Sequence, residues 1–298
     1  MTIQEALERA KRLAREKALQ GADAGANDAA PSKADPREAS KRQGDRPKAQ
    51  PVRLDLHRLN YDAASCELNH ILAPDDGTGW LNAAAVDAYG MVRARMAQKM
   101  KANNWWKVGI TSPGPGEGKT VTALNLALSV ARERNANVFL LDLDLRNPSV
   151  CRYLGVKPQI EITRFFSGEI PLERLFFSIG VDNLAVAGGL SSTSKSSELL
   201  SSGRVDRLID GIRVIDPNCL VIVDLPPVLH AADALVVADS VDAIMMVASV
   251  GVTRRDSLTN ALEVLSAHPL AGLVLNRSDE MVTDYYYGSA RRPSDATA

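Results

Sequence analysis

The segment Ser112-Pro-Gly-Pro-Gly-Glu-Gly-Lys-Thr120 is the most informative part of the sequence, because it lies between an apolar run and a segment of helical spacing. The run Val108 to Thr111 has the composition of a strand, and Val121 to Arg134 has that of a helix. A glycine-rich turn at such a junction offers backbone N–H groups and the positive end of a helix to an anion. We therefore predict a phosphate-binding loop formed by Gly114, Pro115, Gly116, Glu117, Gly118, Lys119, Thr120 and Val121.

The last two residues of the quoted stretch carry its chemistry. Lys119 can reach the β- and γ-phosphates of a nucleotide, and the Thr120 hydroxyl can bind Mg²⁺. The usual pattern has a glycine six residues before the lysine, where this chain has Pro113, so only the Gly-x-Gly-Lys-Thr core is intact. The alternative is a surface turn that contains a lysine by chance, but that interpretation leaves the flanking strand and helix unexplained.

Composition limits the classes of function. The chain has 298 residues, of which 45% are hydrophobic, and this suits one large α/β core with appendages. The net charge is −1, so no overall field recruits nucleic acid. Three cysteines, Cys66, Cys151 and Cys219, lie far apart with no neighbouring histidine, which argues against a disulfide framework and against a zinc site.

We expect neither an export signal nor a membrane-spanning segment in this sequence. Charged residues occupy the N-terminus where a signal peptide would need an apolar core. The longest apolar run, Leu235 to Val250, contains Asp239 and Asp242 and is not expected to span a membrane. We expect a cytoplasmic protein that reaches the inner face of the plasma membrane only through a partner.

The chain divides into three parts by composition. Residues 1–50 combine a short amphipathic helix over 2–19 with a polar linker that is expected to be disordered. That helix is either a frayed terminal helix or a docking helix for a partner or a lipid surface. Residues 51–280 form the predicted catalytic domain, and 281–298 form a polar tail.

The domain reads as an α/β fold with a doubly wound, mainly parallel sheet. We predict an alternating strand over Val52 to Leu56, a loop over 73–79 and helices over Asn82 to Ala102, Ser197 to Ile215 and Arg255 to His268. Continuous apolar strands separated by helices indicate a sheet that is covered on both faces and binds ligands beyond its carboxyl ends. The further predicted strands are Val138 to Leu141, Leu184 to Ala187, Leu220 to Val223, Ala243 to Val247, and Leu273 to Leu275.

Acidic residues follow two of these strands. Asp142 and Asp144 come at the end of one, and Asp224 comes at the end of another, before two prolines that end the strand. A carboxylate at the exit of a buried strand needs a cation, water or hydrogen bonds, and Mg²⁺ on a bound triphosphate supplies these. We assign Asp224 to magnesium, mostly through water, and leave Asp142 and Asp144 to hold metal, orient the attacking group or accept its proton.

Three adjacent tyrosines, Tyr285, Tyr286 and Tyr287, occur in the polar tail. Adjacent aromatic residues in such a context fit neither a helical nor a strand core pattern. We interpret them as exposed hydroxyl groups on a flexible tether, with an aromatic patch that folds back onto the domain as the alternative.

Taken together, these motifs resemble those of the bacterial tyrosine kinases of polysaccharide synthesis and export. The resemblance covers about Leu81 to Tyr287 and includes the phosphate loop, Asp142-x-Asp144-x-Arg146, Val-Asp224-x-Pro-Pro and the terminal tyrosines. It implies an enzyme that depends on ATP and Mg²⁺ and phosphorylates its own tail tyrosines, usually between subunits of a ring. It also implies a membrane chain-length-determinant partner, or polysaccharide co-polymerase, and control of exopolysaccharide or capsule production.

The resemblance also implies roles for individual residues. Lys119 would be catalytic as a phosphate ligand, Asp142 would be the base for a tyrosine hydroxyl and a metal ligand, and Asp144 would be its partner at the metal site. Thr120 and Asp224 would be metal ligands. The last strand ends at Asn276, which would contact adenine.

Two departures from the family pattern bear on assembly and on the metal site. The family carries Glu-x-x-Arg-x-x-Arg at subunit contacts, whereas this chain has Asp87, Gly90 and Arg93, so the middle arginine is missing. Many members have threonine after the metal-binding aspartate, where this chain has Leu225.

Two other functions stay open on sequence alone. One is a nucleotide-driven switch of the partition or septum-positioning type, although those ATPases carry a second lysine where this chain has Gly114. The other is a degenerate kinase that binds ATP and only regulates an export complex.

Overall fold

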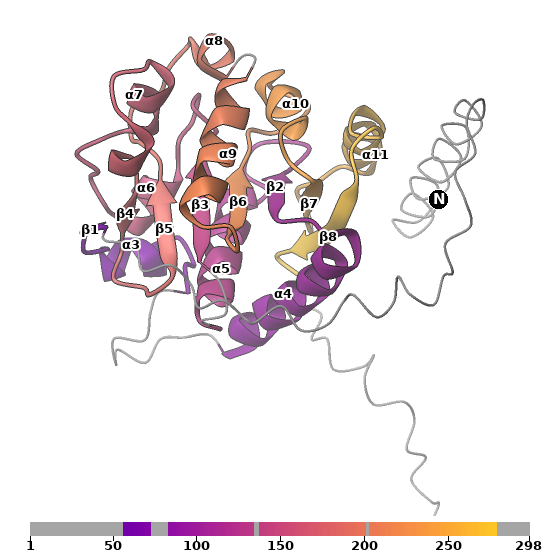
Figure 1. The fold of residues 1–298 in the computed structure, drawn as a ribbon. Coiled ribbons are helices and arrows are strands. Elements are labelled where there is room, and N and C mark those ends of the chain that lie inside the picture. Colours follow the sequence, from indigo (N-terminus) through magenta and orange to yellow (C-terminus); the bar gives the residue numbers. More distant parts are fainter. Residues whose placement is uncertain (1–55, 73–82, 134–136, 201–202, 279–298) are drawn as a thin grey trace, which may run out of the picture.

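The computed structural model describes residues 56–72, 83–133, 137–200 and 203–278 (Figure 1). An eight-stranded sheet runs through this part of the chain in the order β1-β4-β5-β3-β6-β2-β7-β8. Its strands are β1 (His57–Arg58), β2 (Lys107–Thr111), β3 (Val138–Asp142), β4 (Phe177–Ser178), β5 (Leu184–Ala187), β6 (Leu220–Asp224), β7 (Ala243–Ser249) and β8 (Leu270–Asn276).

The mainly parallel sheet predicted from the apolar runs is confirmed. Every pair of neighbouring strands is parallel except β4 and β5. The central strands β3, β6 and β7 are buried along their whole length, as continuous apolar strands covered on both faces should be. The short strands β1 and β4 were not predicted, because two residues give no detectable alternation.

Helices cover both faces of the sheet. Alternate residues of β3 point to opposite sides, so that Val138 and Leu140 pack in one apolar cluster and Phe139 and Leu141 in the other. The first cluster includes side chains of α3 (Ala63–Leu68), α4 (Ala83–Asn103), α5 (Lys119–Ala131) and α6 (Val150–Leu154). The second includes side chains of α7 (Ile162–Phe166), α8 (Ser196–Leu200), α9 (Arg204–Ile215), α10 (Asp233–Ala238) and α11 (Arg255–Val264).

One predicted helix is wrong as a continuous element. The segment Ser197 to Ile215 contains two helices, α8 and α9, and α9 begins after Gly203. Gly203 has φ +75°, a left-handed conformation that glycine adopts without steric cost and that interrupts a right-handed helix. The helix predicted over Arg255 to His268 ends earlier, at Val264.

The helix after the phosphate loop starts at Lys119 instead of Val121, because Gly118 is its N-cap and the last two loop residues, Lys119 and Thr120, belong to its first turn. The predicted helix over 2–19, the linker, residues 52–55 of the first predicted strand, the loop over 73–79 and the tail tyrosines lie outside the described residues. Within the described part of the chain, none of the helices is both long and apolar enough to cross a bilayer.

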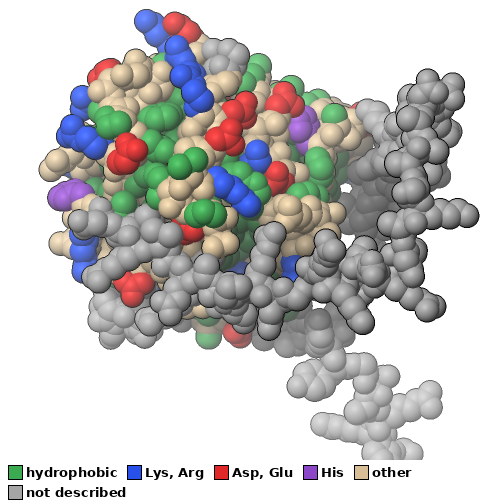
Figure 2. Space-filling view, in the orientation of Figure 1, with side chains coloured by type: hydrophobic (Ala, Val, Ile, Leu, Met, Phe, Trp, Pro, Cys, Tyr) green, Lys and Arg blue, Asp and Glu red, His purple; other side chains and the backbone are tan. Residues whose placement is uncertain are grey.

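Charge is mixed over the surface. Figure 2 shows Lys and Arg side chains interspersed with Asp and Glu side chains on the face that it presents, with hydrophobic side chains between them. This distribution agrees with the net charge of −1, since neither sign dominates that face.

Candidate nucleotide-binding site

The phosphate loop leaves the carboxyl end of β2, between β6 and β7 in the sheet. Gly116 and Gly118 have φ of +76° and +96°, in the left-handed region that side chains disfavour. A Cβ on Gly118 would also lie 2.0 Å from Nδ2 of Asn276. Glycine is therefore required at this position for two independent reasons, and it allows α5 to begin directly at Lys119.

Lys119 is buried against two carboxylates that come from different strands. Its Nζ lies 2.8 Å from Oδ2 of Asp144 and 3.4 Å from Oδ1 of Asp224. The Thr120 hydroxyl donates to Oδ2 of Asp224 at 2.6 Å. The strand order places β3 beside β6 and β6 beside β2, so these four side chains meet although they are far apart in sequence.

The charges in this cluster depend on one another. Burial by itself would lower the pKa of Lys119, but the carboxylates of Asp224 and Asp144 outweigh it and raise the pKa, so the lysine stays charged. Burial raises the pKa of Asp224, against the opposing effects of Lys119 and the Thr120 hydroxyl. The lysine is thus the counter-charge that makes buried carboxylates tolerable here.

Asp142 lies beside Asp224 in the register of β3 and β6, yet its side chain has other partners. Its Oδ2 accepts the backbone N–H groups of Ser149 at 2.8 Å and Val150 at 2.9 Å. The N–H of Asp144 donates to its Oδ1 at 3.2 Å. Burial and the neighbouring Asp224 raise the pKa of Asp142 to about 7, although Lys119 and the backbone donors oppose the shift.

The side chain of Glu117 turns back onto the loop. Its Oε2 accepts the N–H of Gly114 at 3.0 Å, and its Oε1 accepts the Thr253 hydroxyl at 2.8 Å. The sequence suggested that the amides of the loop glycines all face the anion, and this is wrong for Gly114. The N–H of Gly114 donates to the carboxylate of Glu117, a contact that no sequence pattern predicted.

The end of β8 holds the loop from the other side. Nδ2 of Asn276 donates to the carbonyl oxygen of Glu117 at 3.1 Å, and Nη2 of Arg277 donates to that of Gly116 at 3.1 Å. Asn276 therefore contacts the phosphate loop through its amide nitrogen, and its contact with adenine stays a prediction. The contact of Arg277 was not predicted.

The sequence did not predict a polar network that joins Arg146 to the first residues of α8 and of α10. Nε of Arg146 donates to Oδ2 of Asp233 at 2.9 Å and to Oγ of Ser196 at 3.0 Å, and the hydroxyls of Ser196 and Ser197 donate to the same buried carboxylate. Burial would raise the pKa of Asp233, but the two serines and Arg146 lower it. Only the tertiary fold brings the three segments together, so the sequence carried no signal for Asp233.

The donor set suits a hard divalent cation. Thr120 and Asp224 offer a hydroxyl and a carboxylate that already contact each other. Mg²⁺ in phosphate sites is commonly held by one or two such oxygen ligands together with the phosphates of the substrate. These residues fit magnesium. Asp142 is paired with Asp224 in the register of β3 and β6, and its Oδ2 accepts two backbone N–H groups.

The remaining loop residues lie around this cluster. Pro115 and Gly116 are exposed, whereas Gly114, Gly118 and Val121 are half-buried. The tyrosines of the tail lie outside the described residues, so the structure leaves their proximity to the site untested.

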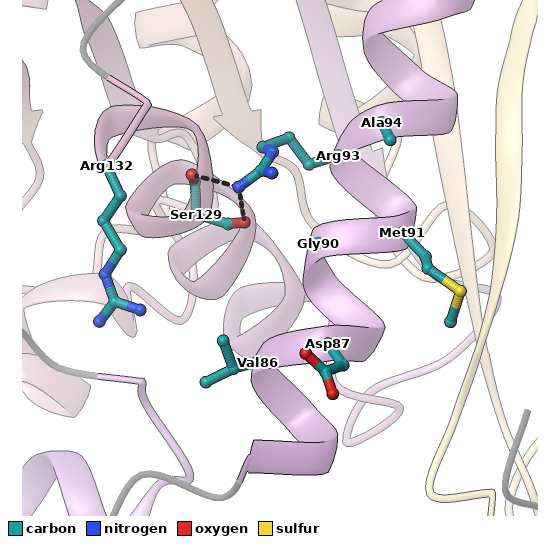
Figure 3. Close-up of a pocket in the computed structure, with 8 residues that line it drawn as sticks. All are labelled: Val86, Asp87, Gly90, Met91, Arg93, Ala94, Ser129 and Arg132. Atoms are coloured by element: carbon teal, nitrogen blue, oxygen red, sulfur yellow. Dashed lines mark hydrogen bonds between the residues drawn. The ribbon is translucent and has the colours of Figure 1, made fainter.

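A separate hollow of about 510 Å³ lies between α4 and the end of α5, and Figure 3 shows its lining. Nη1 of Arg93 donates to the carbonyl oxygen and to the hydroxyl of Ser129 at 3.0 and 3.1 Å, and Nη2 pairs with Glu133 at 2.7 Å. Gly90 faces open space, since a Cβ there would meet nothing within 4 Å. Arg93, in the segment compared with the family's subunit-contact motif, is thus engaged within its own chain.

A glycine loop that ends in lysine and threonine, opposite acids from two neighbouring strands, defines a nucleotide-binding protein of the phosphate-loop class. Residues 108–286 match the CobQ/CobB/MinD/ParA nucleotide binding domain. This match spans more than half of the chain, and the protein belongs to that family.

Individual relatives are tyrosine kinases. The chain is 28% identical over 149 residues to the tyrosine-protein kinase CpsD of Streptococcus agalactiae, covering 49% of this chain and 63% of the relative. It is 31% identical over 157 residues to the tyrosine-protein kinase YwqD of Bacillus subtilis, covering 51% and 65%. The chain therefore spans slightly less than two thirds of the length of these curated relatives.

Solved kinase domains share the fold. The kinase domain of the Escherichia coli tyrosine kinase ETK aligns with a TM-score of 0.62 at 25% identity, covering 80% of this chain and 89% of that domain. The VpsO kinase domain aligns with a TM-score of 0.58 at 26% identity, covering 65% and 97%. The chain is therefore similar to bacterial tyrosine kinases in sequence and in the arrangement of its strands and helices.

Proposed function

We propose that this protein is a protein-tyrosine kinase that depends on ATP and Mg²⁺ and phosphorylates Tyr285, Tyr286 and Tyr287 of its own tail. The observation that carries the proposal is the contact of Lys119 and Thr120 with acids from two strands, at the end of a glycine loop. The similarity to tyrosine kinases selects this activity among those that a phosphate loop supports.

Each residue of the site has a separate role in the proposed phosphoryl transfer. The loop amides of Gly116 and Gly118 and the charge of Lys119 bind the phosphates, which requires Lys119 to exchange its contact with Asp144 for a phosphate oxygen. Thr120 and Asp224 would hold Mg²⁺, and the bound ion would neutralise negative charge on the phosphates.

Asp142 accepts the proton of the tyrosine hydroxyl in this proposal. Burial raises the pKa of this carboxyl group, and a raised pKa makes a carboxylate a better proton acceptor. Its contacts with the backbone N–H groups of Ser149 and Val150 fix the orientation of the carboxylate.

The cellular role follows from the family resemblance. We propose that the kinase acts with a membrane chain-length-determinant protein in exopolysaccharide or capsule production, and that it forms homo-oligomers. The intramolecular pairing of Arg93 and the open space at Gly90 suggest that any assembly through α4 uses other contacts than an arginine pair.

Intact-protein mass spectrometry after incubation with Mg-ATP tests the kinase activity. The wild type should gain phosphate on the tail, and Lys119→Met should gain none, because it removes the charge that binds the phosphates. Calorimetry with ATP on the wild type is the control. An unmodified tail in a wild-type protein that binds ATP would reject the kinase, whereas labelled Lys119→Met would mean that the active site lies elsewhere.

A nucleotide-driven switch is the second candidate, because the matching family also takes its name from MinD and ParA. In that case ATP would change oligomeric state or partner binding without tail phosphorylation. Gly114 favours the kinase, since it lacks the positive charge that the switch ATPases have at this position. Light scattering with and without ATP, together with the mass measurement, separates the two functions.

A further inference from the structure

Two exposed arginines lie at the two ends of the segment that holds Asp142. Two backbone N–H groups of this segment, residues 147–150, donate to Oδ2 of Asp142, as described above. Arg146 directly precedes the segment, and Arg152 follows shortly after it. The carboxyl group that we propose as the base is therefore held by a stretch of chain with a cationic side chain at each end.

The guanidinium of Arg146 is fixed on one side only. Its Nε donates to Oδ2 of Asp233 at 2.9 Å, and its Nη2 donates to the hydroxyl of Ser197 at 3.2 Å. Asp233 is buried, whereas the side chain of Arg146 is 49% exposed. In the described part of the chain, Nη1 donates to no group. A buried carboxylate thus orients this arginine and leaves one of its nitrogens for a ligand.

Arg152 is held by a hydroxyl and an aromatic ring. Its Nη2 donates to Oγ of Ser149 at 2.7 Å, and its guanidinium carbon lies 5.6 Å from the centre of the Tyr153 ring. Ser149 is also one of the two backbone donors to Asp142. Among the described residues, no carboxylate forms an ion pair with Arg152. Its charge is therefore available to an acidic ligand.

Depth separates these arginines from the phosphate-binding residues. The side chains of Lys119 and Asp144 are 9% and 3% exposed, whereas Arg146 and Arg152 are exposed residues. β3 is parallel to β6, and β6 is parallel to β2, so the segment after β3 lies at the same edge of the sheet as the phosphate loop. The two arginines therefore lie on the solvent side of the site, where an acceptor would arrive, and not at the buried positions that would bind the phosphates.

On these grounds, and resting on the proposed kinase function, we propose that Arg146 and Arg152 bind acidic side chains that flank the acceptor tyrosine. The substrate class is then a tyrosine peptide with Asp or Glu on both sides of the tyrosine. A guanidinium suits this ligand, because its planar set of N–H donors matches the two oxygens of a carboxylate. Asp233 is a positioning residue, since it orients Arg146 without contact to the acceptor.

Peptide binding tests the recognition separately from catalysis. Two fluorescent peptides carry one tyrosine, flanked on both sides by Glu in one and by Gln in the other. Fluorescence anisotropy measures their binding to the full-length protein with Mg²⁺ and a non-hydrolysable ATP analogue. The Glu peptide should bind about ten-fold more tightly, and added salt should reduce the difference. Equal affinities, or no measurable binding of either peptide, would overturn the proposal.

Single variants assign the preference to the two arginines. Arg146→Gln and Arg152→Gln should each weaken binding of the Glu peptide about five-fold and leave binding of the Gln peptide unchanged. Arg95→Gln is the matched control, because Arg95 is exposed on α4, whose side chains pack on the opposite face of the sheet from α8 and α10. An equal loss for both peptides would show a structural effect and would contradict the assignment.

Two further variants test the positioning of Arg146. Asp233→Asn should weaken binding of the Glu peptide about as much as Arg146→Gln does, and should add little in the Arg146→Gln background. Ser197→Ala removes a contact at an exposed residue and should lower the preference for Glu without unfolding the protein. A full effect of Asp233→Asn in the absence of the arginine side chain, or an unchanged preference in Ser197→Ala, would contradict the positioning role.

Steady-state phosphorylation of the same peptides measures the consequence for catalysis. Arg146→Gln should raise KM for the Glu peptide about five-fold with kcat unchanged, because the arginine binds the acceptor equally in the ground state and the transition state. A lower kcat at unchanged KM would overturn the assignment to acceptor binding. If the wild type binds the Glu peptide selectively but transfers no phosphate to it, the recognition stands and the kinase function is refuted.

Discussion

At the scale of single residues, Lys119 affects both phosphate binding in the proposed site and the stability of the folded protein. Asp144 and Asp224 are buried, and Lys119 is the cationic side chain that pairs with both of them. Breaking a buried ion pair by removing one partner leaves an uncompensated charge, which is more costly than the pair was favourable. The same residue therefore links stability to nucleotide binding.

Lys119→Met should lower the free energy of unfolding of the nucleotide-free protein by about 3–5 kcal/mol at pH 8. The loss should be smaller at pH 5, because carboxylates whose pKa is raised by burial take up protons in the folded state as the pH falls. Urea unfolding at the two pH values measures both. The exposed Lys195→Met is the control and should stay within about 0.5 kcal/mol. An equal loss at both pH values would contradict the charge argument.

Gly118→Ala should lower ATP affinity at least ten-fold, because its Cβ would lie 2.0 Å from Asn276 and its φ is +96°. Gly203→Ala is a matched control with φ +75° and no neighbour within 4 Å, far from the site in sequence. It should cost about 1–2 kcal/mol of stability and leave ATP affinity unchanged. Calorimetry with ATP measures both variants, and similar affinities for the two would show that the close approach of Asn276 is unimportant.

At the scale of elements, the glycines inside two helices differ in the space around them. Gly90 lies inside α4 beside the hollow of Figure 3, where nothing would contact a Cβ. Gly211 lies inside α9, where a Cβ would come within 2.5 Å of Cδ2 of Leu172. The first glycine lowers helix propensity without a packing reason, whereas a side chain at the second fits only if Leu172 shifts.

Gly90→Ala should therefore raise the free energy of unfolding by about 0.5–1 kcal/mol, since alanine is the better helix former. Gly211→Ala gains the same propensity but must displace Leu172, so it should not be stabilising. Thermal unfolding of the two variants beside the wild type measures the difference. Destabilisation by Gly90→Ala would mean that this face of α4 is packed against something.

At the scale of the whole molecule, a single sheet organises the site, the core and the root of the tail. Its central strands end in the acids, its loop after β2 binds phosphate, and its edge strand β8 leads to the tyrosines. The side chains that the proposed site uses, from the phosphate loop to Asn276, lie within the predicted domain of residues 51–280.

A chain of residues 51–280 should accordingly unfold at the same urea concentration as the full chain and bind ATP with the same affinity. It should show no tyrosine phosphorylation within the tail, because the acceptors have been removed. Urea unfolding, calorimetry and mass spectrometry check the three expectations. A loss of ATP binding would place part of the site outside these residues.

The sequence by itself determined the class of fold and most of the residues that meet at the site. Apolar strands, the glycine loop and the acids at strand ends are local signals, because each follows from the conformation and solvation of a few neighbouring residues. Among the predicted elements that the described residues cover, the continuous helix over 197–215 was wrong, because its periodic pattern masked a helix break at Gly203.

Only the tertiary structure decided which polar groups became partners. The contact of Glu117 with Thr253, of Arg146 with Asp233, and of Arg277 with the loop each join segments far apart in the chain. Such pairs depend on strand order, since β8 and the loop after β7 come close to the phosphate loop only once the parallel sheet is assembled. The sequence pattern predicts which side chains require a charged or hydrogen-bonding partner. The strand order of the folded sheet determines which residue becomes that partner.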